Sequence, residues 1–293
     1  YAVLFLQGGA STQFGSVPLN LLGDKLSADY VNTGQWSKKA IEEGRRYCEV
    51  NVVASSQDTN FSTIPPQDQW QLGNDAAYLH YTPNETIGGV EYFWTPQVQV
   101  PLVADMSSTI LSRPTRVEDF GVIYAGAQKN IGPSGLTLVI VRRDLLGRAN
   151  AMCPAMLNWQ LAADNESMYN TPPTFALYLA ALVFDWLVEQ GGLLGIEKIN
   201  RRKAQKLYAA IDNSDFYANP VELPSRSLMN VTFTLADAAL DKQFLTESES
   251  AGLLNLKGHR SVGGMRASLY NAVSEAAVDA LIAFMLDFEQ RNG

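Results

Sequence analysis

The sequence predicts an α/β fold, with a large domain built on a mainly parallel sheet and a small α+β domain after it. Strand and helix patterns alternate along much of the chain, which is typical of parallel sheets whose strands are joined by helices. Most of the predicted strands are short apolar runs, as expected where both faces of a sheet are covered. A glycine cluster at 191–195 separates these elements from the rest. We therefore expect domains at residues 1–190 and 191–293.

Apolar runs and turn residues place the elements of the large domain. The run at Val3–Leu6 predicts a strand, and Gly8-Gly9 predicts the turn after it. Ser11 or Thr12 is expected to cap the next helix, which would run to about Leu22. The other elements expected here are an amphipathic helix at Trp36–Cys48 and strands at Ala77–Tyr81, Leu102–Asp105, Val122–Tyr124 and Thr137–Val141.

A long apolar helix at Thr174–Glu189 is expected to lead out of the large domain. Gly191-Gly192 and Gly195 follow it and are expected to interrupt the helix, because glycine is a poor helix former. Ser274 is expected to cap the last helix, which would end near Gln290. Between these points we expect a helix at Ile196–Ile211, a strand at Asn230–Leu235, a helix at Lys242–Ala251 and a strand at Met265–Leu269.

Composition excludes several classes of protein. The chain has 293 residues, 46% of them hydrophobic, and a formal net charge of -8, so it has material for a large core. A basic surface for nucleic acid is not expected, and no apolar run is long enough to span a membrane. Cys48 and Cys153 lack the spacing of a zinc site. We expect no metal, a cytoplasmic location and reduced thiols, with a single disulfide as the alternative.

Two charged residues at strand ends indicate the chemistry of the chain. Lys129 follows the strand that ends at Tyr124 and lies among alanines and glycines, so a large planar ligand can approach its amine. Such an amine can form a Schiff base, although most lysines are solvated surface charges. Asp105 ends another apolar strand 24 positions earlier. Pyridoxal phosphate needs both groups, an amine for its aldehyde and a carboxylate for its protonated ring nitrogen.

Six motifs in order give the chain a resemblance to a known family. Along essentially its whole length, the sequence resembles the phosphoserine aminotransferases, pyridoxal-phosphate enzymes of class V and fold type I. The resemblance implies an aspartate-aminotransferase-like fold, with the large domain binding the cofactor. The motifs are GGASTQF at 8–14, HYTPNET at 80–86, SSTILSRP at 107–114, YAGAQKNIGPSG at 124–135, NTPPTF at 170–175, and GHR at 258–260 with GGMRAS at 263–268.

The resemblance implies cofactor-binding roles for residues that also have plainer interpretations. Ala10 and Ser11 match positions that bind the cofactor phosphate, as a helix start after glycines can do; an ordinary strand-to-helix turn is the alternative. Trp36 matches a ring stacked on the cofactor, where a core tryptophan is the usual finding. Thr86 matches a residue that hydrogen-bonds the cofactor, and Gln128 is expected to reach the phosphate; a loop threonine is the alternative for Thr86.

The resemblance also implies roles in catalysis and substrate binding. Lys129 would form the Schiff base and then act as general base and acid, with a pKa depressed by its surroundings. Asp105, otherwise a helix cap, would keep the ring nitrogen protonated. Arg266 matches the residue that grips the substrate carboxylate, which suits a bidentate guanidinium. His259 and Arg260 match residues that bind the substrate phosphate, with exposed charge as the alternative.

A homodimer with shared active sites is a further expectation from the resemblance. Asn170 and Thr171 are implied to cross the interface to the partner's cofactor phosphate, whereas helix capping is the plainer interpretation. The substrate-phosphate residues would reach the partner's site as well, so a monomer would be inactive. His80 is expected to be structural, and Arg113 has no expected role.

The implied reaction moves the amino group of glutamate onto 3-phosphohydroxypyruvate, for serine biosynthesis and, in bacteria, pyridoxine biosynthesis. Family members carry a further N-terminal segment with basic residues before the strand that is Ala2–Leu6 here, so a truncated, non-catalytic chain is one alternative. Another is a sister aminotransferase with a different substrate, against which His259 and Arg260 argue. A nucleotide-binding oxidoreductase is disfavoured, because its glycine fingerprint is missing.

Overall fold

A seven-stranded sheet forms the first lobe of the computed structural model, which describes residues 1–260 and 262–293. In order across the sheet, its strands are β1 (Ala2–Gly8), β9 (Gly135–Val141), β8 (Val122–Gly126), β7 (Leu102–Asp105), β4 (Ala76–Tyr81), β2 (Ser27–Asn32) and β3 (Glu49–Ser55). Among these described strands, β9 alone runs against the others, because it pairs antiparallel with both β1 and β8. The remaining pairs are parallel, so the predicted α/β fold with a mainly parallel sheet is confirmed.

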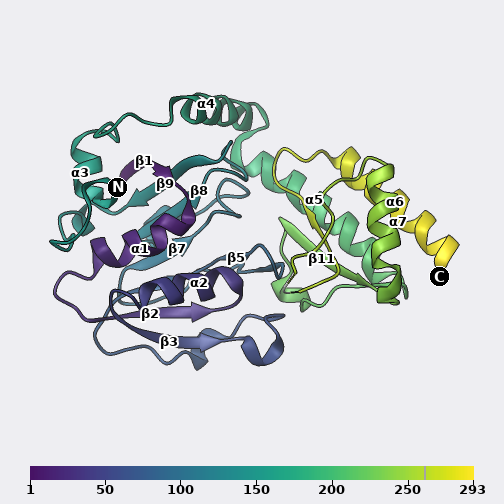
Figure 1. Ribbon diagram of the computed structural model, residues 1–293, viewed down its shortest axis with the longest axis horizontal. Helices are drawn as coiled ribbons and strands as arrows, with labels where there is room; N and C mark the ends of the chain where they lie inside the picture. The colour runs from purple at the N-terminus through teal and green to yellow at the C-terminus, as the bar shows by residue number, and fades with distance from the viewer. Residues whose placement is uncertain (261) are drawn as a thin grey trace.

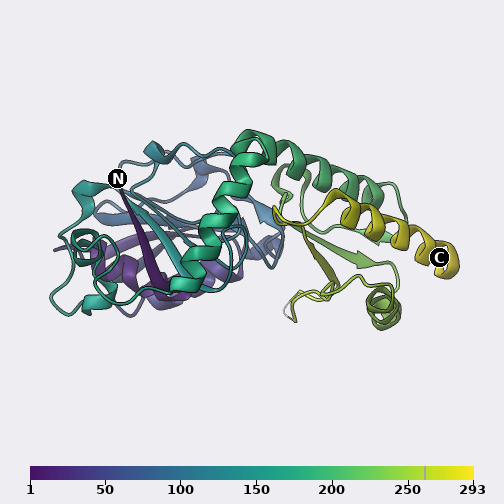
Figure 2. The same cartoon turned by 90° about the horizontal axis from the view of Figure 1, so that it is seen from above.

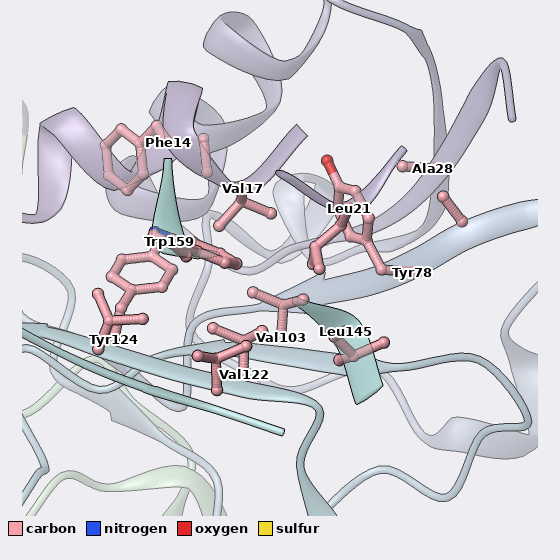
Figure 3. Close-up of a cluster of buried hydrophobic side chains, with 14 of the residues drawn as sticks. Phe14, Val17, Leu21, Ala28, Tyr78, Val103, Val122, Tyr124, Leu145 and Trp159 are labelled. Atoms are coloured by element: carbon pink, nitrogen blue, oxygen red, sulfur yellow. The ribbon is translucent and has the colours of Figure 1, made fainter. Parts of the chain in front are cut away.

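Helices cover both faces of this sheet, as the apolar strands predict. Strand β8 shows the alternation: Val122 and Tyr124 belong to one buried cluster, which Figure 3 draws, and Ile123 and Ala125 belong to the other. The first cluster is completed by α1 (Ala10–Leu21), α2 (Gln35–Gly44) and α3 (Trp159–Asp164), and the second by α4 (Thr174–Glu189).

The second lobe has its own sheet and its own core. Figures 1 and 2 show α5 leading from the first lobe along the second, with the C-terminal helix beside it. The core of this lobe contains Leu207, Phe233, Phe244 and Phe288. The separate cores support a domain boundary near residue 190, which stays a prediction. The elements are α5 (Gly192–Asp212), β10 (Tyr217–Ala218), β11 (Asn230–Leu235), α6 (Asp241–Ser250), β12 (Met265–Ser268) and α7 (Glu275–Asn292), with sheet order β10-β11-β12.

A small hairpin joins the two lobes. It consists of β5 (Asn84–Glu85) and β6 (Val90–Glu91), which pair antiparallel. The Asn84 side chain donates to the Asn230 side chain at 2.9 Å, and the Glu91 carboxylate accepts from the Leu228 N–H at 2.8 Å. The first lobe therefore reaches into the second through buried polar contacts.

The connection between α4 and α5 is bent by 82°. Gly191 lies at the break with a φ of +85°, a left-handed conformation that glycine adopts readily. Gly195, however, lies inside α5, so the expectation that it interrupts the helix is wrong. Within the described residues, no single helix has the length and hydropathy of a membrane span, although the bent pair together reaches that length and composition.

Two expected helix boundaries are also wrong. Helix α1 begins at Ala10 with Gly9 as its N-cap, so Ser11 and Thr12 lie in its first turn and do not cap it. Helix α2 ends at Gly44, because the chain turns there: the N–H groups of Tyr47 and Cys48 both donate to the Gly44 carbonyl. The expected cap of the last helix is confirmed, since the Ser274 side chain accepts from the Ala277 N–H.

Candidate active site

Lys129 lies in the turn between β8 and β9, at the carboxyl end of β8. Its Nζ atom donates to Thr86 Oγ1 at 2.8 Å and lies 5.8 Å from the centroid of the Trp36 ring. Burial lowers the pKa of the Lys129 amine to about 8, against the opposing influence of the Asp105 carboxylate. The nearby Arg266 guanidinium lowers it as well. At pH 7 about a tenth of this amine is therefore neutral and able to act as a nucleophile, a far larger fraction than for an ordinary lysine.

Asp105 ends the neighbouring strand β7, directly opposite Tyr124 in the parallel pairing. Its carboxyl is buried, and its Oδ1 atom accepts from the N–H of Ser107 at 3.0 Å and from Ser107 Oγ at 2.6 Å. Burial raises the pKa of the Asp105 carboxyl, while the two bonds from Ser107 and the charge of Lys129 offset part of that rise. Ligands of open α/β sheets bind at this edge, outside the carboxyl ends of the strands.

The predicted cofactor residues converge on one cleft. The cleft is small and partly open to solvent. Ser11 follows Ala10 in the first turn of α1 and is exposed. The cleft is lined by six of the predicted residues, namely Ala10, Trp36, Thr86, Asp105, Gln128 and Lys129, and also by Thr82, Asn84, Ser107 and Ser108.

The polar atoms of this cleft fit pyridoxal 5'-phosphate. Trp36 Nε1, Thr82 Oγ1 and Asn84 Oδ1 are buried and have no hydrogen-bond partner among the described residues. Buried polar groups are normally paired, so these three atoms indicate a polar ligand. The Lys129 amine can bind the aldehyde of this cofactor, and the Asp105 carboxylate can pair with its ring nitrogen. The unpaired N–H groups at the start of α1 can bind its phosphate. The cofactor expected from the sequence therefore suits the residues present.

Arg266 approaches the cleft from the second lobe. It lies on β12, and its Nη1 atom donates to the Thr86 carbonyl oxygen at 3.5 Å. Its Nε atom is buried without a partner among the described residues. A guanidinium beside the cleft with a free donor suits a carboxylate ligand.

Six predicted residues do not line the Lys129 cleft. Ser11 and Arg266 lie beside it, and the other four lie elsewhere on the chain. Asn170 and Thr171 are exposed beside β1, where the Gln7 side chain donates to the Thr171 carbonyl. His259 and Arg260 are exposed in the loop before β12 and line a separate depression beside α6. The sequence-based expectation places Asn170, Thr171, His259 and Arg260 at the cleft of a partner subunit. A single chain does not test that expectation, so it stays a prediction.

Several residues at or near the cleft had no predicted role. Ser107 orients the Asp105 carboxylate, and the Asn84 side chain donates to Ser108 Oγ at 2.8 Å. Arg113, which had no expected role, forms an ion pair with the buried Glu91 at 3.3 Å. His80 is buried in β4 and bonds to the Tyr124 hydroxyl at 2.8 Å, as expected of a structural residue. The motifs contained these residues. Ser107 bonds to Asp105 two positions away, but the partners of Asn84, Arg113 and His80 lie 24, 22 and 44 positions away.

Comparison with known proteins shows the family. A family model described as aminotransferase class-V matches residues 1–281. The chain belongs to the class-V aminotransferase family. Phosphoserine aminotransferase from Hahella chejuensis is 65% identical over 293 residues, which is 100% of this chain and 81% of that protein. The resemblance drawn from the six motifs is thus confirmed.

Solved structures of class-V aminotransferases have the same fold. The phosphoserine aminotransferase from Bacillus circulans subsp. alkalophilus matches with a TM-score of 0.97 and 49% identity, over 99% of this chain and 81% of that one. A PLP-bound phosphoserine aminotransferase from Trichomonas vaginalis matches with a TM-score of 0.93 and 43% identity, over 97% and 82%. The first and second lobes of this chain therefore have the architecture of the family.

Proposed function

We propose that this chain is a phosphoserine aminotransferase, which moves the amino group of glutamate onto 3-phosphohydroxypyruvate and gives phosphoserine and 2-oxoglutarate. The observation that carries the proposal is the cleft, which gathers four other predicted residues from separate segments around the Lys129 amine and the Asp105 carboxylate. Relatives at 60–65% identity that bear the name phosphoserine aminotransferase support amino transfer with a phosphorylated substrate. Serine biosynthesis is the proposed pathway, with pyridoxine biosynthesis as a second one in bacteria.

Pyridoxal 5'-phosphate is the proposed cofactor, and when bound it supplies an electron sink through which an amino group is exchanged. Lys129 provides the amine that holds it, and with a pKa of about 8 this amine can also accept and return a proton. Asp105 would pair with the ring nitrogen, and the Trp36 ring would cover one face. The N–H groups at Ala10 and Ser11 would bind the phosphate, together with Gln128.

Arg266 is the proposed group for the substrate carboxylate. Its Nε atom is a buried donor without a partner among the described residues, so a bidentate bond to a carboxylate would satisfy it. Its charge already acts on Lys129, since it lowers the pKa of that amine. A substrate carboxylate at Arg266 would therefore lie close to the amine.

A homodimer with shared sites is proposed from the outer face of α4. This helix lies on the outside of the first lobe (Figure 2), yet Phe175, Tyr178 and Val188 are 71%, 61% and 74% exposed. Exposed apolar patches of this kind mark interfaces. Asn170 and Thr171 lie just before α4, so a second copy packed there would bring them towards its own cleft. His259 and Arg260 are proposed to bind the substrate phosphate across the same assembly.

The two alternatives are less well supported. A sister aminotransferase with another substrate is disfavoured by the names of the relatives, and a non-catalytic chain is disfavoured by the convergence of the cleft residues. A cytoplasmic location stays a prediction. The two cysteines, Cys48 and Cys153, are free thiols, which is consistent with a reducing compartment.

Borohydride reduction followed by peptide mass mapping tests the cofactor site. The protein is first mixed with pyridoxal 5'-phosphate, and a pyridoxyl-phosphate mass increment is expected on Lys129. Lys129→Ala should lose the mark and about 10²–10⁴-fold in turnover, the usual contribution of a general acid–base group. A mark on another lysine would refute the site, and no mark together with no turnover would favour a non-catalytic chain.

The same preparation tests the substrate. With glutamate as amino donor, 3-phosphohydroxypyruvate should be a better acceptor than pyruvate or glyoxylate, as judged by kcat/KM. If an unphosphorylated acceptor reacts faster, the chain is a sister aminotransferase and the assignment of His259 and Arg260 fails with it.

A further inference from the structure

The Glu85 carboxylate is a buried charged group at the edge of the cleft for which the proposed function gives no role. It lies on β5 and is 1% exposed. It accepts hydrogen bonds from the backbone N–H groups of Trp36 at 2.9 Å and Ser37 at 2.8 Å, in the first turn of α2. These N–H groups have no partner within the helix, and the positive end of the helix dipole favours a carboxylate there.

Gly34 makes room for this carboxylate. It is the N-cap residue of α2, and it has no side chain that could accept from the first N–H groups of the helix. A Cβ atom at this position would lie 2.5 Å from the Cδ atom of Glu85. Glu85 therefore takes the place that the N-cap side chain has in other helices, although it lies 49 residues away from Trp36.

The residues on both sides of Glu85 connect it to the chemistry of the cleft. Thr86 follows it, and the hydroxyl of Thr86 accepts from the Lys129 amine at 2.8 Å. Asn84 precedes it and is held by Ser108 Oγ at 2.8 Å and Asn230 Oδ1 at 2.9 Å. A short, fixed segment thus contacts both the backbone that carries the Trp36 ring and the amine of Lys129.

We propose that Glu85 is a positioning residue: its carboxylate fixes the start of α2, so that the Trp36 ring is held at the cofactor plane beside Lys129. Burial and the Asp105 carboxylate raise the pKa of the Glu85 carboxyl, and the hydrogen bonds from Ser37 and Trp36 offset part of that rise. The role rests on the geometry, since each of the two carboxyl oxygens accepts from one N–H group of α2. The inference deepens the proposed function and rests on the cofactor proposed there.

A double-mutant cycle in cofactor binding tests the proposal. Glu85→Gln replaces one acceptor oxygen with an amide that cannot accept, so one of the two bonds to α2 is lost. Titration of the cofactor-free protein with pyridoxal 5'-phosphate should then show a dissociation constant raised about tenfold, the upper size of a lost aromatic stacking contact. In a Trp36→Ala background the same change should have a much smaller effect, because only the direct influence of the Glu85 charge on Lys129 is left.

Glu91→Gln is the matched control. Glu91 lies on the other strand of the same hairpin, is 0% exposed, and likewise has a pKa raised by burial. Its carboxylate bonds to Leu228 and Arg113 and not to α2. Glu91→Gln should cost folding stability in urea as Glu85→Gln does, but should leave the cofactor affinity unchanged.

Amide hydrogen exchange tests the positioning without the cofactor. In the cofactor-free protein, Glu85→Gln should speed exchange at the Trp36 and Ser37 amides by about tenfold or more, as expected when a bond to a charged acceptor is lost. Glu91→Gln should leave these amides protected. This result keeps the inference separate from the proposed function, since it holds whether or not the wild-type protein binds pyridoxal phosphate.

Three results would overturn the proposal. One is unchanged exchange at both amides in Glu85→Gln. Another is a loss of cofactor affinity of the same size with and without the Trp36 ring, which would mean that Glu85 does not act through it. The third is an equal loss in Glu91→Gln, which would reduce the effect to general weakening of the hairpin.

Discussion

The Lys129 amine lies among charges that oppose one another. Burial and the Arg266 guanidinium favour its neutral form, whereas the Asp105 and Glu85 carboxylates favour the protonated form. The resulting pKa of about 8 lies below that of an ordinary lysine, so the folded protein releases this proton at lower pH than the unfolded chain does. The nucleophile is thus prepared by the fold before any ligand binds.

This balance predicts the pH dependence of acylation at Lys129. Only the neutral amine reacts, so the rate of trace acetylation in the cofactor-free protein should rise with pH to a half-maximum near pH 8. In denaturant, the same lysine should reach its half-maximum near pH 10.4. Mass spectrometry of the Lys129 peptide measures both curves. Coincident curves would show that the fold does not shift this group.

Single residues differ in how far their roles can be predicted from sequence. Lys129 and Asp105 were recognisable because each follows an apolar strand, which places both at one edge of a parallel sheet. Glu85 lies in the same motif as Thr86, but its partners begin 49 residues earlier. No local pattern encodes a helix cap supplied from another part of the chain, so this role required the fold.

Among the elements, α5 contains an uncommon residue, a fully buried lysine. Lys203 is 0% exposed, and its Nζ atom donates to the backbone carbonyls of Leu269 at 2.9 Å, Tyr270 at 3.0 Å and Val273 at 2.9 Å. Burial lowers the pKa of this amine to about 8, so it remains largely protonated at neutral pH. Helix α5 is therefore fastened to the segment that follows β12.

Replacing this amine should cost more stability than replacing its neighbour on the exposed side of α5. Lys203→Met leaves three carbonyls without a donor, and we expect a loss of about 3 kcal/mol in the free energy of unfolding, measured in urea. Lys206→Met removes an exposed ion pair with Asp279 and should cost less than about 1 kcal/mol. Similar costs for both variants would mean that the three carbonyls find other donors, such as water.

Strands β2 and β3 show where element prediction failed. β2 (Ser27–Asn32) lies inside the sheet, but it contains serine, aspartate and asparagine, which are uncommon in strands. Its sequence therefore does not show the apolar run by which the other strands were predicted. The fold satisfies the buried Asp29 through the Asn51 side chain at 2.8 Å and the Gly73 N–H at 3.0 Å. Strand β7, an apolar run that ends in Asp105, was predicted with its observed ends. So was β11, because Val231, Phe233 and Leu235 alternate with polar residues in the pattern of a strand.

On the scale of the whole molecule, the outer face of α4 predicts the oligomeric state. Leu182 lies on this face and is 47% exposed, so Leu182→Asp places a charge in the proposed interface. We expect a monomer by sedimentation, together with a loss of turnover, because Asn170 and Thr171 would no longer reach a partner's cleft. Leu286→Asp on α7, where the leucine is 50% exposed, should remain dimeric and active. A dimer in both variants would exclude α4 as the interface.

The β5–β6 hairpin has a consequence for how the molecule unfolds. The two lobes have separate apolar cores, which would ordinarily allow each to melt alone. The hairpin belongs to the first lobe in sequence, yet the carboxylate of Glu91 is bound to Leu228 and the amide of Asn84 to Asn230. Loss of the second lobe would leave these groups buried without partners or exposed to water. We therefore expect the segment that contacts Lys129 to be one of the links through which the two lobes unfold together.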